Sequence, residues 1–222
     1  NGSTTITPSA YSFSQDAGFS IIKYTGNSTS GAKIAHGLGV APDVMIVKAT
    51  NAAYEWPVYH SSLGATKLIQ LESTGAASTS SVAWNNTEPD SVNFTVQANA
   101  RTNTGSVYVG YMFAEKQGYS KFGSYIGNGN NNDENYIAYI FAEKQGYSKM
   151  GSYIGNGNAN GTFVYTGFKP ALIIIKNSAG TDNWWIIDNK RSPFNQVERA
   201  LLPNTNDVES TSDVDLDITS QG

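Results

Sequence analysis

The chain repeats a segment of 18 residues almost without change. Residues 113–130 read FAEKQGYSKFGSYIGNGN and residues 141–158 read FAEKQGYSKMGSYIGNGN, so the two copies differ only where Phe122 is replaced by Met150. Identity at this level indicates a duplication within the gene. A repeated sequence of this kind indicates a modular fold, in which similar structural units follow one another along the chain.

A second and more divergent repeat lies at an offset of 128 residues. VAPDVMIVK at residues 40–48 aligns without gaps on FKPALIIIK at residues 168–176, and Trp56 falls on Trp184. The alignment divides the chain into an N-terminal segment (1–17), a first module (18–115), an abbreviated module (116–145) and a second module (146–222). The N-terminal segment matches neither module, and we expect it to be either a segment of its own or the end of a preceding domain.

Both later modules are shorter than the first. Ungapped alignment places Gly222 on Phe94, so the second module lacks a counterpart of residues 107–113 at its end. The abbreviated module joins an opening sequence, GYSKFGSYIGNGN, directly to an ending sequence, NYIAYIFAE, with no middle. Either recombination removed most of a module, or part of the natural chain is missing from this sequence.

Local patterns predict strands nearly everywhere. Short runs of β-branched and aromatic residues alternate with turn formers, and no stretch of 12 residues keeps a helical period. The expected strands are Ser20–Tyr24, Val44–Lys48, Val58–His60, Lys67–Leu71, Asn93–Gln97, Val107–Phe113, Tyr136–Phe141, Phe163–Tyr165, Leu172–Lys176 and Trp184–Asp188. Strands without intervening helices favour an all-β fold of two tandem antiparallel β-sandwich modules over a parallel α/β sheet.

The abbreviated module is expected to form a hairpin across a turn from Asn128 to Asn135. Its ending strand resembles the strand that the second module lacks, since Tyr136, Tyr139 and Phe141 match Tyr108, Tyr111 and Phe113. An unpaired strand edge exposes backbone groups that favour pairing. We therefore predict that Tyr136–Phe141 closes the second module, either within the chain or from a neighbour.

Composition weighs against several classes of function. A net charge of −4 gives no basic field for phosphates, which argues against nucleic acid as a partner. The absence of Cys excludes a disulfide framework and a thiolate site, and the longest apolar run, Ala171–Ile175, is too short for membrane insertion. Only two histidines occur, His36 and His60, and no catalytic motif surrounds them, so we expect no enzyme.

An acidic tract near the C-terminus offers oxygen ligands for Ca²⁺. Its members are Asp207, Glu209, Asp213, Asp215 and Asp217. The tract lacks a calcium-loop spacing, and its last three carboxylates alternate with apolar residues as in a strand with one wet face. We expect no cofactor, with Ca²⁺ at this tract as the alternative, and a structural role for His36 in its glycine-rich turn.

Aromatic residues give the strongest indication of a binding site. Rings stack on sugar C–H faces while neighbouring amides and carboxylates bond the hydroxyls. The candidate carbohydrate-binding residues are Tyr54, Tyr59, His60, Trp185 and Asp188. Trp56 and Trp184 recur in both modules and are more simply explained as core residues. Trp185 should then point to the opposite face of its strand and be exposed.

The pattern YTGN, HGLGVAPDVMIVK, WPVYHSSLGATK and SVAWNNTEPDSVNFTV, followed by the repeated FAEKQGYSK segments, closely resembles tandem domains in tail-fibre-like and other virion proteins of tailed phages. The resemblance covers nearly the whole chain. It implies concanavalin- or lectin-like jelly-roll sandwiches without assigned catalytic residues, located on the surface of the virion.

The function expected from these features is that of a non-enzymatic virion structural protein, a tail or head fibre that contributes to host-cell attachment. The alternative is a carbohydrate-binding lectin-like module, and the remote alternative is a polysaccharide-degrading enzyme. The expected partners are further copies of the chain, most simply as a trimer, other virion proteins and a host surface glycan.

Overall fold

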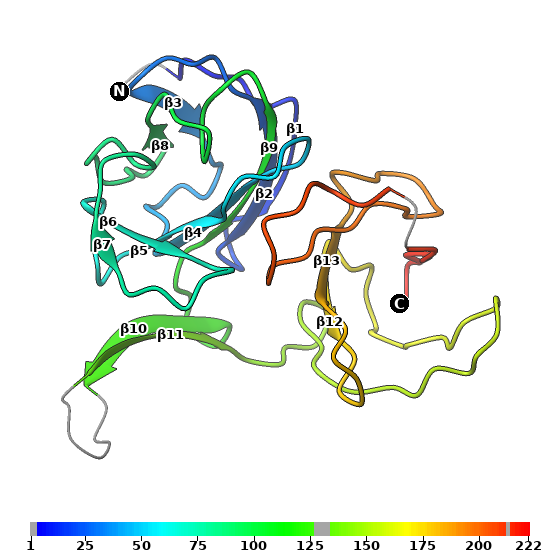
Figure 1. The fold of residues 1–222 in the computed structure, drawn as a ribbon. Helices are drawn as coiled ribbons and strands as arrows, with labels where there is room; N and C mark the ends of the chain where they lie inside the picture. Colours follow the sequence, from blue (N-terminus) through cyan, green and yellow to red (C-terminus); the bar gives the residue numbers. More distant parts are fainter. Residues whose placement is uncertain (1–3, 127–133, 212–213) are drawn as a thin grey trace.

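The computed structural model describes residues 4–126, 134–211 and 214–222, and all regular structure there is β (Figure 1). The strands are β1 (Ala10–Ser14), β2 (Phe19–Thr25), β3 (Ala32–Ala35), β4 (Val44–Ala49), β5 (Pro57–His60), β6 (Lys67–Gln70), β7 (Ser78–Thr79), β8 (Asn93–Val96), β9 (Val107–Phe113), β10 (Ser120–Ile126), β11 (Asn135–Phe141), β12 (Leu172–Lys176) and β13 (Trp184–Asp188). This part of the chain holds no helix long and apolar enough to cross a bilayer. The predicted all-β, antiparallel class is confirmed.

The first module is built on a seven-stranded sheet with the order β1-β2-β9-β4-β5-β6-β7. All its pairings are antiparallel. The last strand of the module, β9, lies between β2 and β4, so Tyr111 is paired with Ile21 on one side and with Ile46 on the other. The sheet is therefore complete only when the end of the module returns to its middle.

One face of this sheet packs against the two-stranded sheet β3–β8, which gives a β-sandwich (Figure 1). Alternate residues such as Met45 and Val47 point into the core between the sheets, because successive side chains of a strand face opposite sides. Tyr24 and Tyr108 stack there with ring centroids 5.2 Å apart, and both are fully buried. We call this side of the seven-stranded sheet the inner face.

The described residues of the N-terminal segment are part of this sandwich. β1 pairs with β2 along its whole length and forms an edge of the large sheet. Ile6 is buried and bridges to Ile34 of β3. Sequence patterns missed β1 because its serines alternate with aromatic rings that remain exposed, as Tyr11 and Phe13 show.

The abbreviated module forms a hairpin, as predicted, with β10 paired to β11 from Ser120↔Phe141 to Ile126↔Asn135. The predicted turn from Asn128 to Asn135 lies mostly outside the described residues. Among those residues β11 pairs only with β10, and β12 pairs only with β13. The prediction that Tyr136–Phe141 closes the second module within the same chain is therefore wrong.

The second module contains much less regular structure than the first. β12 and β13 pair from Leu172↔Asp188 to Lys176↔Trp184, and beyond them only isolated bridges such as Ile186↔Leu201 occur among the described residues. The strand predicted at Phe163–Tyr165 is absent, and both aromatic rings of that run are exposed. Among the described residues no strand pairs with this run.

Candidate functional site

The face of the seven-stranded sheet opposite β3–β8 is also apolar, and we call it the outer face. Its residues alternate along the strands with those of the inner face, and they fall into two further buried clusters. They are Ile21, Val44, Ile46, Trp56, Val58, Val109, Tyr111 and Phe113. A sheet that is apolar on both faces needs a covering layer on each side.

The second module covers the part of the outer face formed by β2 and β9. Ile186 of β13 and Leu201 are buried in one cluster with Ile21 and Val109. Polar contacts surround this cluster: the indole Nε1–H of Trp56 donates to the Thr205 carbonyl at 2.8 Å, and the Lys48 ammonium donates to the Asn206 carbonyl at 3.0 Å. Residues more than 140 positions apart in sequence are thereby joined.

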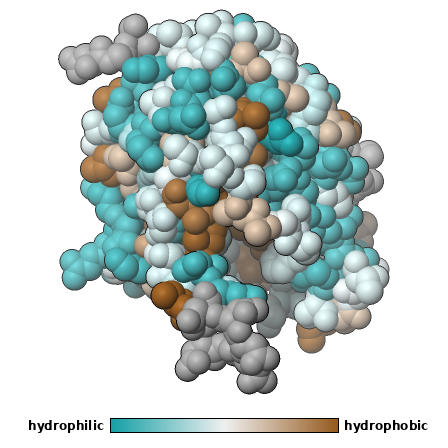
Figure 2. Space-filling view, turned by 60° about the vertical axis from the view of Figure 1, so that its left-hand side comes forward, coloured by the Kyte–Doolittle hydropathy of each residue, from teal (hydrophilic) through white to brown (hydrophobic). Residues whose placement is uncertain are grey.

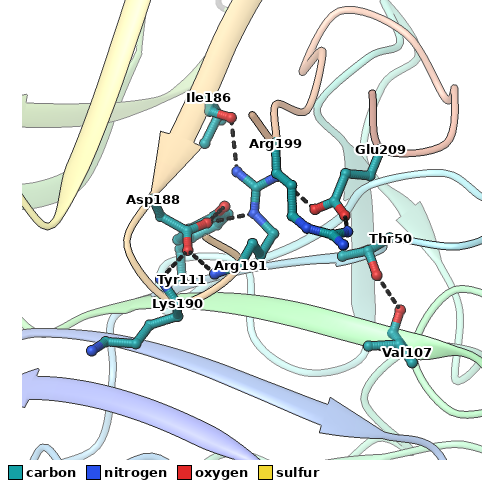
Figure 3. Close-up of polar contacts among 9 residues, drawn as sticks. All are labelled: Thr50, Val107, Tyr111, Ile186, Asp188, Lys190, Arg191, Arg199 and Glu209. Atoms are coloured by element: carbon teal, nitrogen blue, oxygen red, sulfur yellow. Dashed lines mark hydrogen bonds and ion pairs between the residues drawn. The ribbon is translucent and has the colours of Figure 1, made fainter. Parts of the chain in front are cut away.

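A buried group of charges lies at this contact between the modules (Figure 3). Arg191 Nε lies 2.5 Å from Asp188 Oδ2, and Arg191 Nη1 lies 2.9 Å from Glu209 Oε1. The hydroxyl of Tyr111, from the first module, donates to Asp188 at 2.8 Å. The side chains of Asp188 and Arg191 are almost completely buried, and buried charges of this kind persist only when paired and hydrogen-bonded.

The ionisation states follow from this arrangement. Burial alone would raise the pKa of Asp188, but the charge of Arg191 and the hydrogen bonds from Arg191 and Tyr111 outweigh it and hold that pKa below its ordinary value. Burial raises the pKa of Tyr111 far above its ordinary value, so the phenol stays protonated and donates. For Lys48, the charged form of which is the cation, burial instead lowers the pKa to about 8.

The hairpin β10–β11 covers the other part of the outer face, over β4 and β5 (Figure 1). Phe122 is buried against Val44 and Val58, and the ring of Phe141 lies 5.4 Å from that of Phe113. The ring of Tyr139 meets His60 edge-on at 5.5 Å. The outer face is thus covered by two separate segments that both follow it in sequence.

The two covers use equivalent positions. Tyr139 matches Tyr111 at the offset of 28 residues, and His60 matches Asp188 at the offset of 128. Tyr139, in β11, contacts His60 at the end of β5. Tyr111, in β9, donates to Asp188, the counterpart of His60 at the end of β13. The contact between outer faces therefore repeats along the chain, and it is the candidate functional site of the molecule.

The five sequence-predicted carbohydrate-binding residues do not form an open site. Tyr59, His60 and Asp188 are buried, and Tyr54 and Trp185 are partly buried. Tyr59 donates to Glu88 at 2.6 Å inside the first sandwich, while His60 and Asp188 lie in the contacts just described. None of the five presents a ring face and a free acceptor together to solvent.

The expected exposures of the two adjacent tryptophans are reversed. Trp184, the counterpart of the fully buried Trp56, is 46% exposed, whereas Trp185 packs against the apolar cluster around Ile187. Trp56 is buried because the Thr205 loop of the second module lies on it. Nothing in the described residues performs that role for Trp184, so the assumption that equivalent residues share equivalent burial was wrong.

The other titratable candidates have structural roles. His36 is buried, with Nε2 3.0 Å from the Asp90 carbonyl and Nδ1 accepting from the Leu38 amide at 3.2 Å, as expected for a turn. Glu88 accepts from Tyr59 and from the Ala65 amide.

The described residues contain no cluster of three or more potential metal ligands. In the acidic tract Glu209 is engaged by Arg191 and Arg199, while Asp213 lies outside the described residues. The tract therefore gives no support for a Ca²⁺ site, and Ca²⁺ there stays a prediction.

Two of the surface pockets that the described residues form are lined in part by residues already discussed. One, of about 390 Å³, lies between the modules and is lined by Lys23, Thr50 and Arg199 among others. The other, of about 230 Å³, is lined by the exposed and mutually stacked rings of Tyr11 and Phe13 together with His36. Phe13 packs directly on Gly37, whose φ of +79° and lack of a Cβ both favour glycine.

Comparison with known proteins identifies a family but no characterised relative. The family model described as "Domain of unknown function (DUF7483)" matches the chain twice, over residues 1–133 and 129–222. The chain therefore belongs to this family, and the two consecutive matches agree with the repeat at an offset of 128. No curated protein and no solved structure matches the chain significantly.

Proposed function

We propose that the chain is a non-enzymatic structural protein of a virion, a segment of a tail or head fibre built from tandem jelly-roll β-sandwiches, and that it contributes to host-cell attachment. The observation that supports this most strongly is the apolar outer face of the first module. Its residues, such as Trp56 and Val109, are fully buried only because later segments of the chain lie on them.

A module with two apolar faces can bury both of them in a stack of modules, whereas an isolated module would leave one of them in water. Large apolar patches on monomers mark interaction sites, because leaving them in water is costly. In this chain each covering segment places its own outer-face residues on the module before it, as Tyr139 and Ile186 do. Such an arrangement produces a stiff series of modules, which is the property a fibre needs. The resemblance to tandem domains of phage virion proteins supplies the virion location.

Immunogold electron microscopy of phage particles from the source of this sequence tests the virion location. Antibodies raised against the purified chain should label a fibre at a fixed place on the particle, and adsorption to the host should fall when the same antibodies are added. Absence of label from intact and from disrupted particles would contradict the proposal. Antibodies absorbed with the purified chain beforehand provide the control.

A second candidate function is glycan binding, and one observation favours it at a place that the sequence did not indicate. Tyr11 and Phe13 are stacked at 5.9 Å, exposed, and border a pocket that also contains Thr7. Adjacent rings with a nearby hydroxyl suit a pyranose ring. A glycan array with the wild type and with Tyr11→Ala tests this function, and Tyr153→Ala, at a similarly exposed ring elsewhere, is the matched control. Binding unaffected by Tyr11→Ala would remove the site from consideration.

A further inference from the structure

Strand β12 has a free edge, and the equivalent edge in the first module is occupied by a partner strand. β4, its counterpart, is bonded to β5 on one side and to β9 on the other, whereas β12 is bonded to β13 alone in the described residues. Ile174 of β12 is 55% exposed, while its counterpart Ile46 lies within the outer-face clusters. Exposed strand edges with apolar side chains recruit further strands.

Strand β11 has the complementary free edge. The hairpin β10–β11 reproduces the pairing of β2 with β9: Tyr125 stacks on Tyr136 at 5.2 Å, as Tyr24 stacks on Tyr108 at the same distance. In the first module β9 uses its other edge to bond β4. β11 is bonded only to β10 in the described residues, so the edge that corresponds to the β4-binding edge is open.

The register of the missing pair follows from the first module. Val44↔Phe113 and Ile46↔Tyr111 become Leu172↔Phe141 and Ile174↔Tyr139 when each residue is replaced by its counterpart. Joining these edges would give the order β10-β11-β12-β13, which corresponds to β2-β9-β4-β5 of the first module. The hairpin and the second module thus contain, between them, counterparts of the central four strands of the first module's sheet.

The side of the hairpin that corresponds to the inner face is left uncovered. Its residues Tyr125, Tyr136 and Ile140 are between 42% and 57% exposed, whereas their counterparts in the first module are buried. Figure 2 shows hydrophobic surface at the lower end of the molecule, where Figure 1 places β10 and β11. The hairpin therefore has both an edge and a face that a complete sandwich would bury.

We propose that the free edge of β12 binds the β11 strand of a second copy of this chain, so that each copy completes the second module of another. The same chain does not supply the strand, because its two hairpins run in different directions (Figure 1) and share no ladder. The donor hairpin keeps its own contact with β4 and β5 and offers only its open edge. The contact is head-to-tail, so copies join as a reciprocal dimer, as a ring or as an open series.

The inference deepens the fibre function and rests on it, but its test is independent. Because the chain has no Cys, single cysteines can be introduced without background. Tyr139→Cys protein and Ile174→Cys protein, mixed and mildly oxidised, should form a disulfide-linked heterodimer, identified by mass spectrometry of the linked peptides. Ile174 is 55% exposed and Tyr139 is 37% exposed, so Tyr139→Cys removes the ring contact with His60 but neither change empties a fully buried site. A protein with Ser124→Cys, on the far strand of the hairpin, replaces Tyr139→Cys as the control.

Size-exclusion chromatography with light scattering provides the second measurement. The wild type should have at least twice the mass of the 23.8 kDa chain, and Ile174→Lys, which places a charge at the β12 edge, should have the mass of one chain. Phe194→Lys, at a residue 81% exposed elsewhere, should leave the assembly intact. A monomeric wild type, or cross-linking from residue 124 as efficient as from residue 139, would overturn strand exchange. Neither result would alter immunogold labelling of the particle, so failure here is distinguishable from failure of the fibre function.

Discussion

Strands β4–β5 of the first module and β12–β13 of the second have equivalent sequences and the same hairpin pairing, but their surroundings differ. Trp56 is fully buried and Trp184 is 46% exposed, and Ile46 is covered whereas Ile174 is 55% exposed. The pairs β2–β9 and β10–β11 show the same contrast, since they share a tyrosine stack that is buried in one and open in the other.

The difference shows which properties are local. Pairing of adjacent strands and the stacking of cross-strand rings depend on residues within one hairpin, and they recur wherever the sequence recurs. Burial depends on which segments lie on either face, and these come from distant parts of the chain: the contacts to Thr205 and Asp188 span 149 and 77 residues. Substitutions at equivalent positions should therefore have unequal effects wherever the environments differ and equal effects wherever only local contacts matter.

The largest difference is expected between Trp56→Ala and Trp184→Ala. Removing Trp56 empties a fully buried site and deletes the 2.8 Å bond to Thr205, so the free energy of unfolding should fall by about 3–5 kcal/mol. Trp184→Ala should cost about 1 kcal/mol or less, because that ring is half in water already. Urea unfolding of both variants, under identical conditions, measures the difference. Equal losses would show that the equivalent sites share one environment after all.

Asp188→Ala should have the next largest effect. The change leaves the buried guanidinium of Arg191 without its nearest carboxylate, although Glu209 remains 2.9 Å away, so a loss of about 3 kcal/mol is expected. The double variant Asp188→Leu with Arg191→Met should recover much of it, because no charge is then left unpaired. A double variant less stable than Asp188→Ala in urea would contradict this account of the cluster.

The pH dependence should separate the equivalent residues His60 and Asp188. Burial lowers the pKa of His60 from 6.5, so the stability that neutral His60 provides is complete above that pH and is lost as the pH falls through the lower, folded value. The lowered pKa of Asp188 means that its contribution is lost only below about pH 4. Hydrogen exchange at pH 5.5, corrected for intrinsic rates, should therefore increase in β11, which lies over His60, before it increases in β13.

The control for this comparison is His60→Gln. It should remove the response of β11 while leaving any response from His36, the pKa of which burial also lowers. If hydrogen exchange increased in β13 before it increased in β11 between pH 7.5 and 5.5, the assignment of this response to His60 would be contradicted.

Most strands and the β10–β11 hairpin were predictable from sequence, because β-branched and aromatic runs bounded by turns depend on local preferences. β3 was missed because Ala32–Ala35 is short and lacks such a run. The burial of the predicted glycan residues could not be predicted, because the composition of a strand does not reveal which face is covered: Tyr59 bonds Glu88 and Asp188 bonds Arg191 inside the molecule.

The contact between outer faces could have been suspected from one signal. Val44, Ile46, Val109 and Tyr111 alternate with inner-face residues that are equally apolar. A strand that is apolar on both sides indicates a sheet covered on both sides. The identity of the covering segments could not be obtained in this way, because alternation along a strand does not show which distant segment lies on it.

The smallest effects are expected at the ion pairs inside the repeated segment. Lys121 lies 2.6 Å from Glu115, and Lys149 lies 2.7 Å from Glu143, and in both copies the glutamate also accepts the amide seven residues later. The hydrogen bond from the lysine, followed by that from the amide, lowers the pKa of each glutamate. Any stability that they provide is therefore present above the ordinary pKa and lost as the pH falls through the lower, folded one.

Glu115→Gln and Glu143→Gln should each shift the urea midpoint little, since exposed ion pairs contribute little to stability. More importantly, the two shifts should be equal at every pH from 3 to 7. Both contacts lie within the repeated segment, 113–130 or 141–158, so its two copies should behave alike although one adjoins the first module and the other the second. A urea midpoint lowered by Glu115→Gln alone would show that the neighbouring module changes the stability provided by even these local contacts.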